Sequence, residues 1–320
     1  MRVIKFFKIT RSIVLVIIIL IIILLGIMAI YHHIMLKSEK KHIKTVGNRV
    51  KVDGFNMNVY VEGVEQKKEN PTIVLLSGSG VAAPVYDYKV LYSKLTDKYR
   101  VAVVEKFGYG YSDVSGKDRD VIKMVEEDRR ALQKAGESGP FVLMPHSMSA
   151  LEAIYWAKTY PDEVKAIIGL DMAVPDSYNK NDNNISKITF MKVMTFFGAH
   201  RIRMFNYINE NGLTKKEIEQ HKYLVYKNSL NNDVYEECKM VYENAEIVKK
   251  IGTPDIPILM FTTNLNGSNG WKGWVDAQEN FALQSDKCMQ IKLECGHNLH
   301  YYESDFLSKR IKEFMEEMNK

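Results

Sequence analysis

The chain has 320 residues, 46% of them apolar, which is enough for one large domain or two small ones with a sizeable core. Its net charge of +5 is spread unevenly: residues 1–44 hold eight lysines and arginines and a single acidic residue, Glu39. Residues 45–320 therefore carry 36 basic and 38 acidic residues, a net charge of −2. A domain this close to neutrality gives no indication of nucleic-acid binding.

The first element is an apolar run over residues 13–30 that contains no charge. As a helix it would be about 27 Å long, close to the thickness of the hydrocarbon core of a bilayer. A cleaved signal peptide also has a basic start, but its apolar region is only about 7–15 residues long and ends in small residues. This run instead ends in Met28-Ala29-Ile30-Tyr31. We therefore expect residues 1–31 to be an uncleaved transmembrane anchor.

Basic residues flank the run on both sides, which leaves the charge bias across it nearly even. Those before it are Arg2, Lys5, Lys8 and Arg11, and those after it are Lys37, Lys40, Lys41 and Lys44. The first group lies closer to the run, and a large C-terminal domain is translocated largely regardless of its flanking charges. We expect a single-pass membrane protein with an extracytoplasmic main domain, joined to the anchor by a polar, basic stalk over residues 32–47.

A β-hairpin is predicted next, from residues 48–52 and 56–61 joined through Asp53-Gly54. Beyond it, apolar runs typical of buried strands alternate with helical segments. The predicted strands are residues 72–76, 101–104, 141–144, 164–170, 258–261 and 289–293. The predicted helices are residues 86–95, 121–135, 150–159 and 306–318. This alternation indicates an α/β fold, in which a mostly parallel sheet is covered by helices on both faces.

Residues 172–254 interrupt the alternation before the penultimate strand and divide the predicted core into residues 48–171 and 255–320. The interval contains helical stretches at residues 188–197, 202–208, 223–230 and 234–248. It is either a long helical connection or a helical lid over the carboxyl edge of the sheet. In a lid, six apolar side chains would line a pocket: Met191, Met194, Phe196, Phe197, Met204 and Phe205.

Ser147 stands at the turn between a predicted strand and a predicted helix. Such a turn pushes a serine out at the carboxyl edge of the sheet, and the helix N-terminus beneath it offers N–H groups to an oxyanion. The segment Pro145-His146-Ser147-Met148-Ser149 resembles the nucleophile elbow of the α/β-hydrolase family, usually Gly-x-Ser-x-Gly, although both glycines are replaced. Taken alone, the segment also fits a serine that only caps a helix.

Two further motifs extend the resemblance, which covers residues 48–318. Ser77-Gly78-Ser79-Gly80 stands where the family has His-Gly-x, and the resemblance implies an oxyanion hole formed by the N–H groups of Ser79 and Met148. Residues 105–113 resemble the family's Asp-x-x-Gly-x-Gly-x-Ser turn, with Glu105 in first place. We expect that turn to shape a loop beside the site without taking part in chemistry.

Cys295-Gly296-His297 follows the last predicted strand, where the family places its catalytic base. His300 and His146 are weaker candidates for the base, because His300 starts the closing helix and neighbours on a turn, such as His146 and Ser147, point apart. Two histidines in the lid interval have no carboxylate partner identified from the sequence: His200 and His221. The three cysteines, Cys238, Cys288 and Cys295, form neither a disulfide framework nor a metal-ligand spacing, and Cys295 is expected to be a packed residue.

The acid of the site is the least direct assignment. The family's commonest position, after the strand at 258–261, reads Thr263-Asn264-Leu265-Asn266 and holds no carboxylate. Asp171 ends the preceding predicted strand, where some lipases and dehalogenases of this fold hold their acid. Asp171 could instead cap a turn, in which case Asp276, in the loop predicted before the last strand, is the other candidate.

A serine rather than an aspartate at the elbow predicts acyl transfer to water through an acyl-enzyme. We therefore expect an esterase or lipase-like carboxylic ester hydrolase in which Ser147 attacks, His297 moves the proton and Asp171 orients His297. No metal or organic cofactor is implied, and the anchor and lid favour a lipid-like or other hydrophobic acyl substrate. Two alternatives stay open: a serine peptidase or amidase of the same fold, and a non-catalytic binding module displayed on the membrane.

Overall fold

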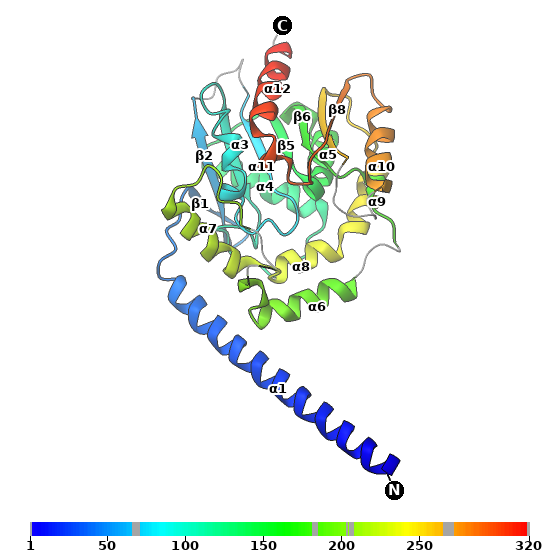
Figure 1. Cartoon of the computed structure of the whole chain (residues 1–320). Helices are drawn as coiled ribbons and strands as arrows, with labels where there is room; N and C mark the ends of the chain where they lie inside the picture. Colours follow the sequence, from blue (N-terminus) through cyan, green and yellow to red (C-terminus); the bar gives the residue numbers. More distant parts are fainter. Residues whose placement is uncertain are drawn as a thin grey trace.

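The computed structural model describes residues 2–65, 71–180, 185–202, 204, 208–264 and 272–318. Within these residues lies an eight-stranded sheet with the strand order β1-β2-β4-β3-β5-β6-β7-β8 (Figure 1). The strands are β1 (Asn48–Val52), β2 (Phe55–Gly63), β3 (Ile73–Leu76), β4 (Arg100–Glu105), β5 (Phe141–Pro145), β6 (Val164–Leu170), β7 (Ile258–Thr263) and β8 (Cys288–Leu293). The β1–β2 and β2–β4 pairs are antiparallel and the other pairs are parallel, so the predicted mostly parallel sheet is confirmed.

Three helices lie within two residues of the bounds predicted for them, 121–135, 150–159 and 306–318, whereas the others differ more or were not predicted. The helices are α1 (Arg2–Glu39), α2 (Pro84–Asp87), α3 (Lys89–Tyr92), α4 (Val121–Ala135), α5 (Ala150–Thr159), α6 (Ile185–Phe196), α7 (Lys215–Asn228), α8 (Asn232–Lys239), α9 (Val241–Ile251), α10 (Lys272–Ala282), α11 (Leu299–Tyr302) and α12 (Ser304–Glu317). Asp120 caps α4 by accepting a hydrogen bond from the Lys123 N–H, and Gly136 ends it in the left-handed conformation. The helix predicted over residues 86–95 is divided at Tyr88 into α2 and α3.

Both faces of the sheet are covered by helices. Buried apolar side chains of α4, α5, α9 and α10 pack with those of β3, β4 and β5 on one face, around Trp156. On the other face α3, α11 and α12 pack against the opposite side chains of the same strands. Because β-strand side chains alternate between faces, the central strands are buried on both sides.

The interval 172–254 covers the carboxyl edge of the sheet with α6, α7 and α8, while α9 packs against α5 as part of the core. The predicted helical stretch 202–208 falls partly outside the described residues, as does Phe205. Three of the side chains expected to line a pocket are exposed to solvent instead: Met191 at 47%, Phe196 at 58% and Met204 at 80%. These exposed side chains do not line an interior pocket, and α6 contacts α8 through Thr189 and Lys192 instead.

α1 is a single helix that continues eight residues past the anchor expected from the sequence, to Glu39. In the described part of the chain, α1 is the one helix long and apolar enough to cross a membrane. The segment expected to be a free stalk packs against the lid: Glu39 forms a bidentate ion pair with Arg201, at 2.7 and 2.8 Å. The Lys44 N–H donates to Gln220, whose side-chain amide donates to the His42 carbonyl. The polar segment is therefore part of the folded domain.

Candidate active site

Ser147 sits between β5 and α5, in the short 3-10 helix η1 (Ser147–Ser149). Its φ of +57° lies in the left-handed region, which is rare for a residue with a side chain and costs on the order of 1–3 kcal/mol. The Ser147 carbonyl is held by the N–H of Ala173, at 2.9 Å. The strained turn is thus fixed from the neighbouring strand, and it projects the serine from the carboxyl edge of the sheet.

The elbow tolerates the loss of its two usual glycines because other residues supply what the turn needs. The Ser149 hydroxyl lies 2.8 Å from the Leu76 carbonyl and 2.9 Å from the His146 carbonyl, which ties η1 to the end of β3. The close approach is made instead at Gly78, where an added Cβ would meet the Ser147 Cβ and the His146 carbonyl at 3.0 Å. A glycine therefore fits this position in the β3 loop without crowding the elbow.

The structure brings Ser147, His297 and Asp171 into one hydrogen-bonded chain. His297 Nε2 lies 2.9 Å from Ser147 Oγ, and His297 Nδ1 lies 2.6 Å from Asp171 Oδ2. The three residues follow β5, β8 and β6, so their strands all end at the same edge of the sheet. With Nδ1–H donating to the carboxylate, Nε2 is left to accept the serine proton, which is the arrangement a general base needs.

Asp171 is fully buried and is held by donors that the sequence analysis did not single out. Its Oδ1 accepts from the Thr263 N–H at 3.2 Å, from Trp274 Nε1 at 3.3 Å and from Gln278 Nε2 at 3.1 Å. The Thr263 hydroxyl donates to Oδ2 at 2.9 Å. Burial alone would raise the pKa of Asp171, but the hydrogen bond and charge of His297, with the donors Gln278 and Thr263, lower it below its usual value. The carboxylate therefore stays ionised beside the imidazole.

The other candidate acid, Asp276, is not in a loop before the last strand as the sequence suggested. It lies within α10 and is exposed, whereas Trp274 and Gln278 project from the buried face of the same helix toward Asp171. Three and four residues along a helix share a face, but two residues do not, so Asp276 is turned away from Asp171. Asp276 therefore lies on the exposed side of α10, away from Asp171 and His297.

The remaining histidines differ in part from the expectations. His146 does not simply point away from the site: its ring packs 4.8 Å from that of His297, and its nitrogens lie 2.9 Å from the Tyr88 hydroxyl and 3.1 Å from the His297 carbonyl. His300 is buried and packs 4.5 Å from the Tyr88 ring. His221 has a carboxylate partner, Asp87, 3.3 Å away. Through its contact with the His297 carbonyl, His146 helps to hold the loop that carries His297.

Burial, together with the nearby charges of His297 and His300, holds the pKa of His146 well below its usual range. Burial likewise lowers the pKa of His300 to about 3. Both rings are therefore neutral at physiological pH, and neither competes with His297 for the serine, since His146 already uses both ring nitrogens.

The loop after β3 lies beside the nucleophile and is anchored without the histidine that the family usually has. The Gly78 N–H donates to the Tyr88 hydroxyl and the Gly80 N–H donates to the Tyr109 hydroxyl, each at 3.3 Å. Between them, the Ser79 hydroxyl lies 3.2 Å from Cys238 Sγ of α8. The lid therefore touches the loop that carries the expected oxyanion donor.

A buried ion cluster links the lid to the core behind that loop. Lys106 Nζ donates to Glu152 at 2.7 Å and to Glu237 of α8 at 2.6 Å, and the Tyr109 hydroxyl donates to Glu237 at 2.6 Å. Burial opposes the charge of Lys106, but the two carboxylates raise its pKa above the usual value. Glu105 is also buried and accepts from the Tyr111 N–H at 2.7 Å, so the turn at residues 105–113 has a structural role.

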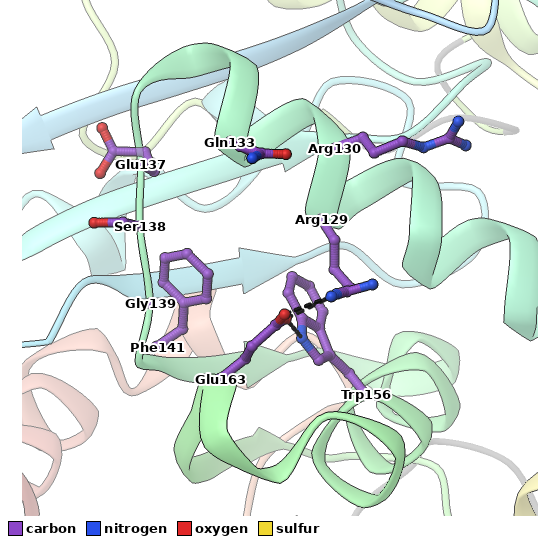
Figure 2. A pocket seen from close by; sticks show the side chains of 9 residues that line it. All are labelled: Arg129, Arg130, Gln133, Glu137, Ser138, Gly139, Phe141, Trp156 and Glu163. Carbon is purple, nitrogen blue, oxygen red and sulfur yellow. Dashed lines mark hydrogen bonds and ion pairs between the residues drawn. The ribbon is translucent and has the colours of Figure 1, made fainter.

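A cavity of about 310 Å³ lies elsewhere, between α4, α5 and the start of β5 (Figure 2). Phe141, in its wall, begins the strand that ends at Pro145, so β5 separates this cavity from Ser147 by up to about 20 Å. Its charged side chains are already paired: Arg129 with Glu163, Arg130 with Asp53 and Glu137 with Arg100. This cavity offers no unsatisfied charge to a ligand. Among the residues that the structure describes, no cluster of three His, Cys, Asp or Glu is placed to hold a metal ion.

Comparisons with known proteins agree with this architecture. Residues 71–304 match the family profile described as alpha/beta hydrolase fold. The chain is 36% identical over 298 residues to the uncharacterised protein YbdG of Bacillus subtilis strain 168, covering 89% of this chain and 90% of that protein.

Solved structures share the fold at low sequence identity. An enol-lactonase from Burkholderia xenovorans LB400 superposes with a TM-score of 0.63 at 12% identity, covering 84% of this chain and 100% of that one. A loop variant of the haloalkane dehalogenase DbeA from Bradyrhizobium elkanii gives a TM-score of 0.61 at 13% identity, covering 85% and 96% of the two chains. One fold thus carries different chemistries in these proteins, so the reaction has to be argued from the residues of the site.

Proposed function

Because the chain belongs to the alpha/beta hydrolase fold family, we propose that it is a serine hydrolase that cleaves carboxylic esters through an acyl-enzyme. The observation that carries the proposal is the unbroken chain of hydrogen bonds from Ser147 through His297 to Asp171. Epoxide hydrolases and dehalogenases of this fold use an aspartate as the nucleophile, whereas this chain has a serine at that position. Such a triad catalyses acyl transfer to water, and ester cleavage is one reaction of that kind.

In the proposed reaction, Ser147 Oγ attacks the ester carbonyl carbon while its proton passes to His297 Nε2. The alcohol leaves with that proton, and water then attacks the acyl-enzyme with His297 again as base. Asp171 holds the imidazole in the required tautomer and stabilises the imidazolium. The N–H groups of Ser79 and Met148 would donate to the oxyanion, in keeping with the close packing of Gly78 against Ser147.

The site can be tested with a fluorophosphonate, which labels activated serines. We expect labelling of the wild type at Ser147 and loss of labelling and ester turnover in Ser147→Ala, with residual rate enhancement of at most about 10³–10⁴ over water. Ser79→Ala is a matched control, because it removes a nearby hydroxyl but keeps the backbone N–H. Full activity in Ser147→Ala would end the proposal, and absence of labelling in the wild type would favour a binding module.

The acyl group of the substrate is proposed to be hydrophobic, and the protein to stay membrane-anchored through α1. Retention of α1 is supported by Glu39 and His32, which bind Arg201 of the lid and would be lost or exposed if the helix were removed. A panel of esters of increasing acyl length, with matched amides, tests the substrate class. Faster turnover of amides than of esters would instead favour a peptidase or amidase.

The domain is further proposed to lie outside the cytoplasm, because the basic residues before the apolar run stand closer to it than those after it. Protease added to intact cells should then remove the domain. Protection of the domain until the cells are lysed would place it in the cytoplasm.

A further inference from the structure

The helix α6 presents its apolar side chains outward. Ile185, Phe190, Met191, Val193 and Phe196 are between 40% and 64% exposed, and Ile202 and Met204, which follow the helix, are 44% and 80% exposed. We call these seven residues the α6 face. Single exposed apolar residues are ordinary, but a run of large ones along one helix and its continuation marks an interaction surface.

Two polar side chains of α6 hold the helix against α8. The Thr189 hydroxyl lies 2.8 Å from the Tyr235 hydroxyl of α8, and Lys192 Nζ donates to Asn232 of α8 at 2.9 Å. Lys192 also lies over the Tyr235 ring, 4.1 Å from its centroid. A helix on a water-exposed surface usually turns its large apolar residues inward, whereas five large apolar residues of α6 are 40% to 64% exposed. The medium outside α6 is therefore expected to be apolar.

The end of α6 packs against α1, and this contact indicates which apolar medium surrounds α6. The His33 ring of α1 packs 5.1 Å from the Phe196 ring, and the His32 ring packs 4.9 Å from that of His200, in η4 (Ala199–Arg201). Figure 1 shows α6 at the end of the domain from which α1 emerges. The α6 face is thus continuous with the helix proposed to cross the membrane.

The contact with His33 also sets the depth of the α6 face. His33 is three residues beyond Ile30, where the apolar run ends, a rise of about 4.5 Å along a helix. The polar interface of a bilayer adds about 5–7 Å on each side of the hydrocarbon core. Phe196 therefore lies within the interfacial layer if residues 13–30 span the core.

We infer that the α6 face lies in the interface of the same bilayer that α1 crosses, so that the lid is a second membrane contact. The inference rests on the proposed anchor. A helix lying in the interface buries its apolar face about 5–10 Å into the boundary between headgroups and acyl chains. Since α8 joins α6 to the active-site loop through Cys238 and Ser79, this places the lid between the lipid surface and Ser147. The occupant of the α6 face is lipid rather than a second copy of the chain.

The test uses the full chain reconstituted in vesicles, with one tryptophan added to the α6 face. Phe190→Trp is the reporter and Val193→Trp is a second one, in case the first variant fails to fold. Leu283→Trp is the matched control, because Leu283 is 85% exposed and follows α10 just before β8, at the sheet edge opposite the lid. The three native tryptophans contribute the same background to every variant.

Lipids brominated near the glycerol end of the acyl chain quench tryptophan only on contact. We expect them to lower the added emission of Phe190→Trp and Val193→Trp to about half, with a blue shift, and to leave that of Leu283→Trp unchanged. Unquenched reporters in chains that resist carbonate washing would overturn the inference while leaving the anchor intact. A blue shift without quenching would also overturn it, in favour of a protein occupant. Chains washed off by carbonate would overturn the anchor and, with it, the inference.

Discussion

Gln278 of α10 donates a hydrogen bond to Asp171, with Nε2 and Oδ1 3.1 Å apart. Trp274, one turn earlier on the same face, donates to the same oxygen. These donors occupy Oδ1 and leave Oδ2 to His297 Nδ1. The carboxylate is thereby held in one orientation, which in turn orients the imidazole toward Ser147.

Asp171→Asn should lower kcat by about 10²–10⁴, because an asparagine neither stabilises the imidazolium nor fixes the tautomer that accepts the serine proton. The measurement is steady-state ester turnover, with a thermal melt to show that the variant is folded. Asp276→Asn is the control on the exposed face of α10 and should cost less than about tenfold, the equivalent of 1.36 kcal/mol in the barrier. The reverse ranking would move the acid to Asp276, and no effect from either would leave a Ser–His dyad.

Cys295 should react slowly with alkylating reagents although it lies two residues from His297. Burial, with the charges of Glu303 and Asp171, raises the pKa of the Cys295 thiol to about 11. At pH 8 the thiolate is then about 0.1% of the population, roughly a hundredfold less than for an ordinary cysteine. Peptide mapping after timed iodoacetamide treatment measures the rate at each cysteine. Rapid labelling of Cys295, or loss of turnover in Cys295→Ala, would contradict a packing role.

The sequence located the sheet and the residues at its carboxyl edge because those signals are local. Buried strands appear as short apolar runs, and Ser147, Asp171 and His297 each follow such a run directly. The positions of these residues could therefore be predicted, including an aspartate one strand before the place where the family most often has its acid.

The donors around Asp171 had no such signal. Trp274 and Gln278 lie on α10, which was not predicted as a helix, and Thr263 stood in a segment considered only for its lack of a carboxylate. Their function depends on two segments meeting in space. A run of apolar residues at helical spacing likewise does not show which side of α6 packs on the protein, so Met191 and Phe196, and Met204 after the helix, were expected inside.

Stability should fall as the pH is lowered from about 6.5 toward 3, in part through His300. Its pKa is lowered to about 3 in the native state by burial and by the charge of His297, against an ordinary value of 6.5. Between about pH 3 and pH 6.5 the His300 side chain is therefore protonated in the unfolded chain but not in the native protein. The free energy of unfolding is then highest above pH 6.5 and decreases as the pH falls below it. One such group contributes about 1.4 kcal/mol per pH unit.

The measurement is the free energy of unfolding at several pH values between about 4 and 6. His300→Phe should reduce the pH slope by about 1.4 kcal/mol per unit, since phenylalanine keeps the ring contacts with Tyr88 but takes no proton. An unchanged slope in His300→Phe would show that other groups, such as His146, dominate.

Removal of residues 1–31 should release the domain from carbonate-washed membranes while turnover of a water-soluble, short-chain ester is kept. The core of the domain is complete without those residues, because its buried clusters begin at Val52.

Removal of residues 1–44 should also release the domain, but it should lower the free energy of unfolding. It takes away Glu39, whose partner Arg201 has a side chain only 10% exposed, and the contacts of His42 and Lys44 with Gln220. A buried charge left without its partner is destabilising by about 3 kcal/mol. Guanidinium unfolding of the two truncated chains measures the difference, and Glu39→Gln in the longer one should reproduce most of it. Equal stability of the two would mean that residues 32–44 are a stalk after all. Carbonate-resistant membrane binding of either would show an attachment surface other than α1 that holds the domain by itself.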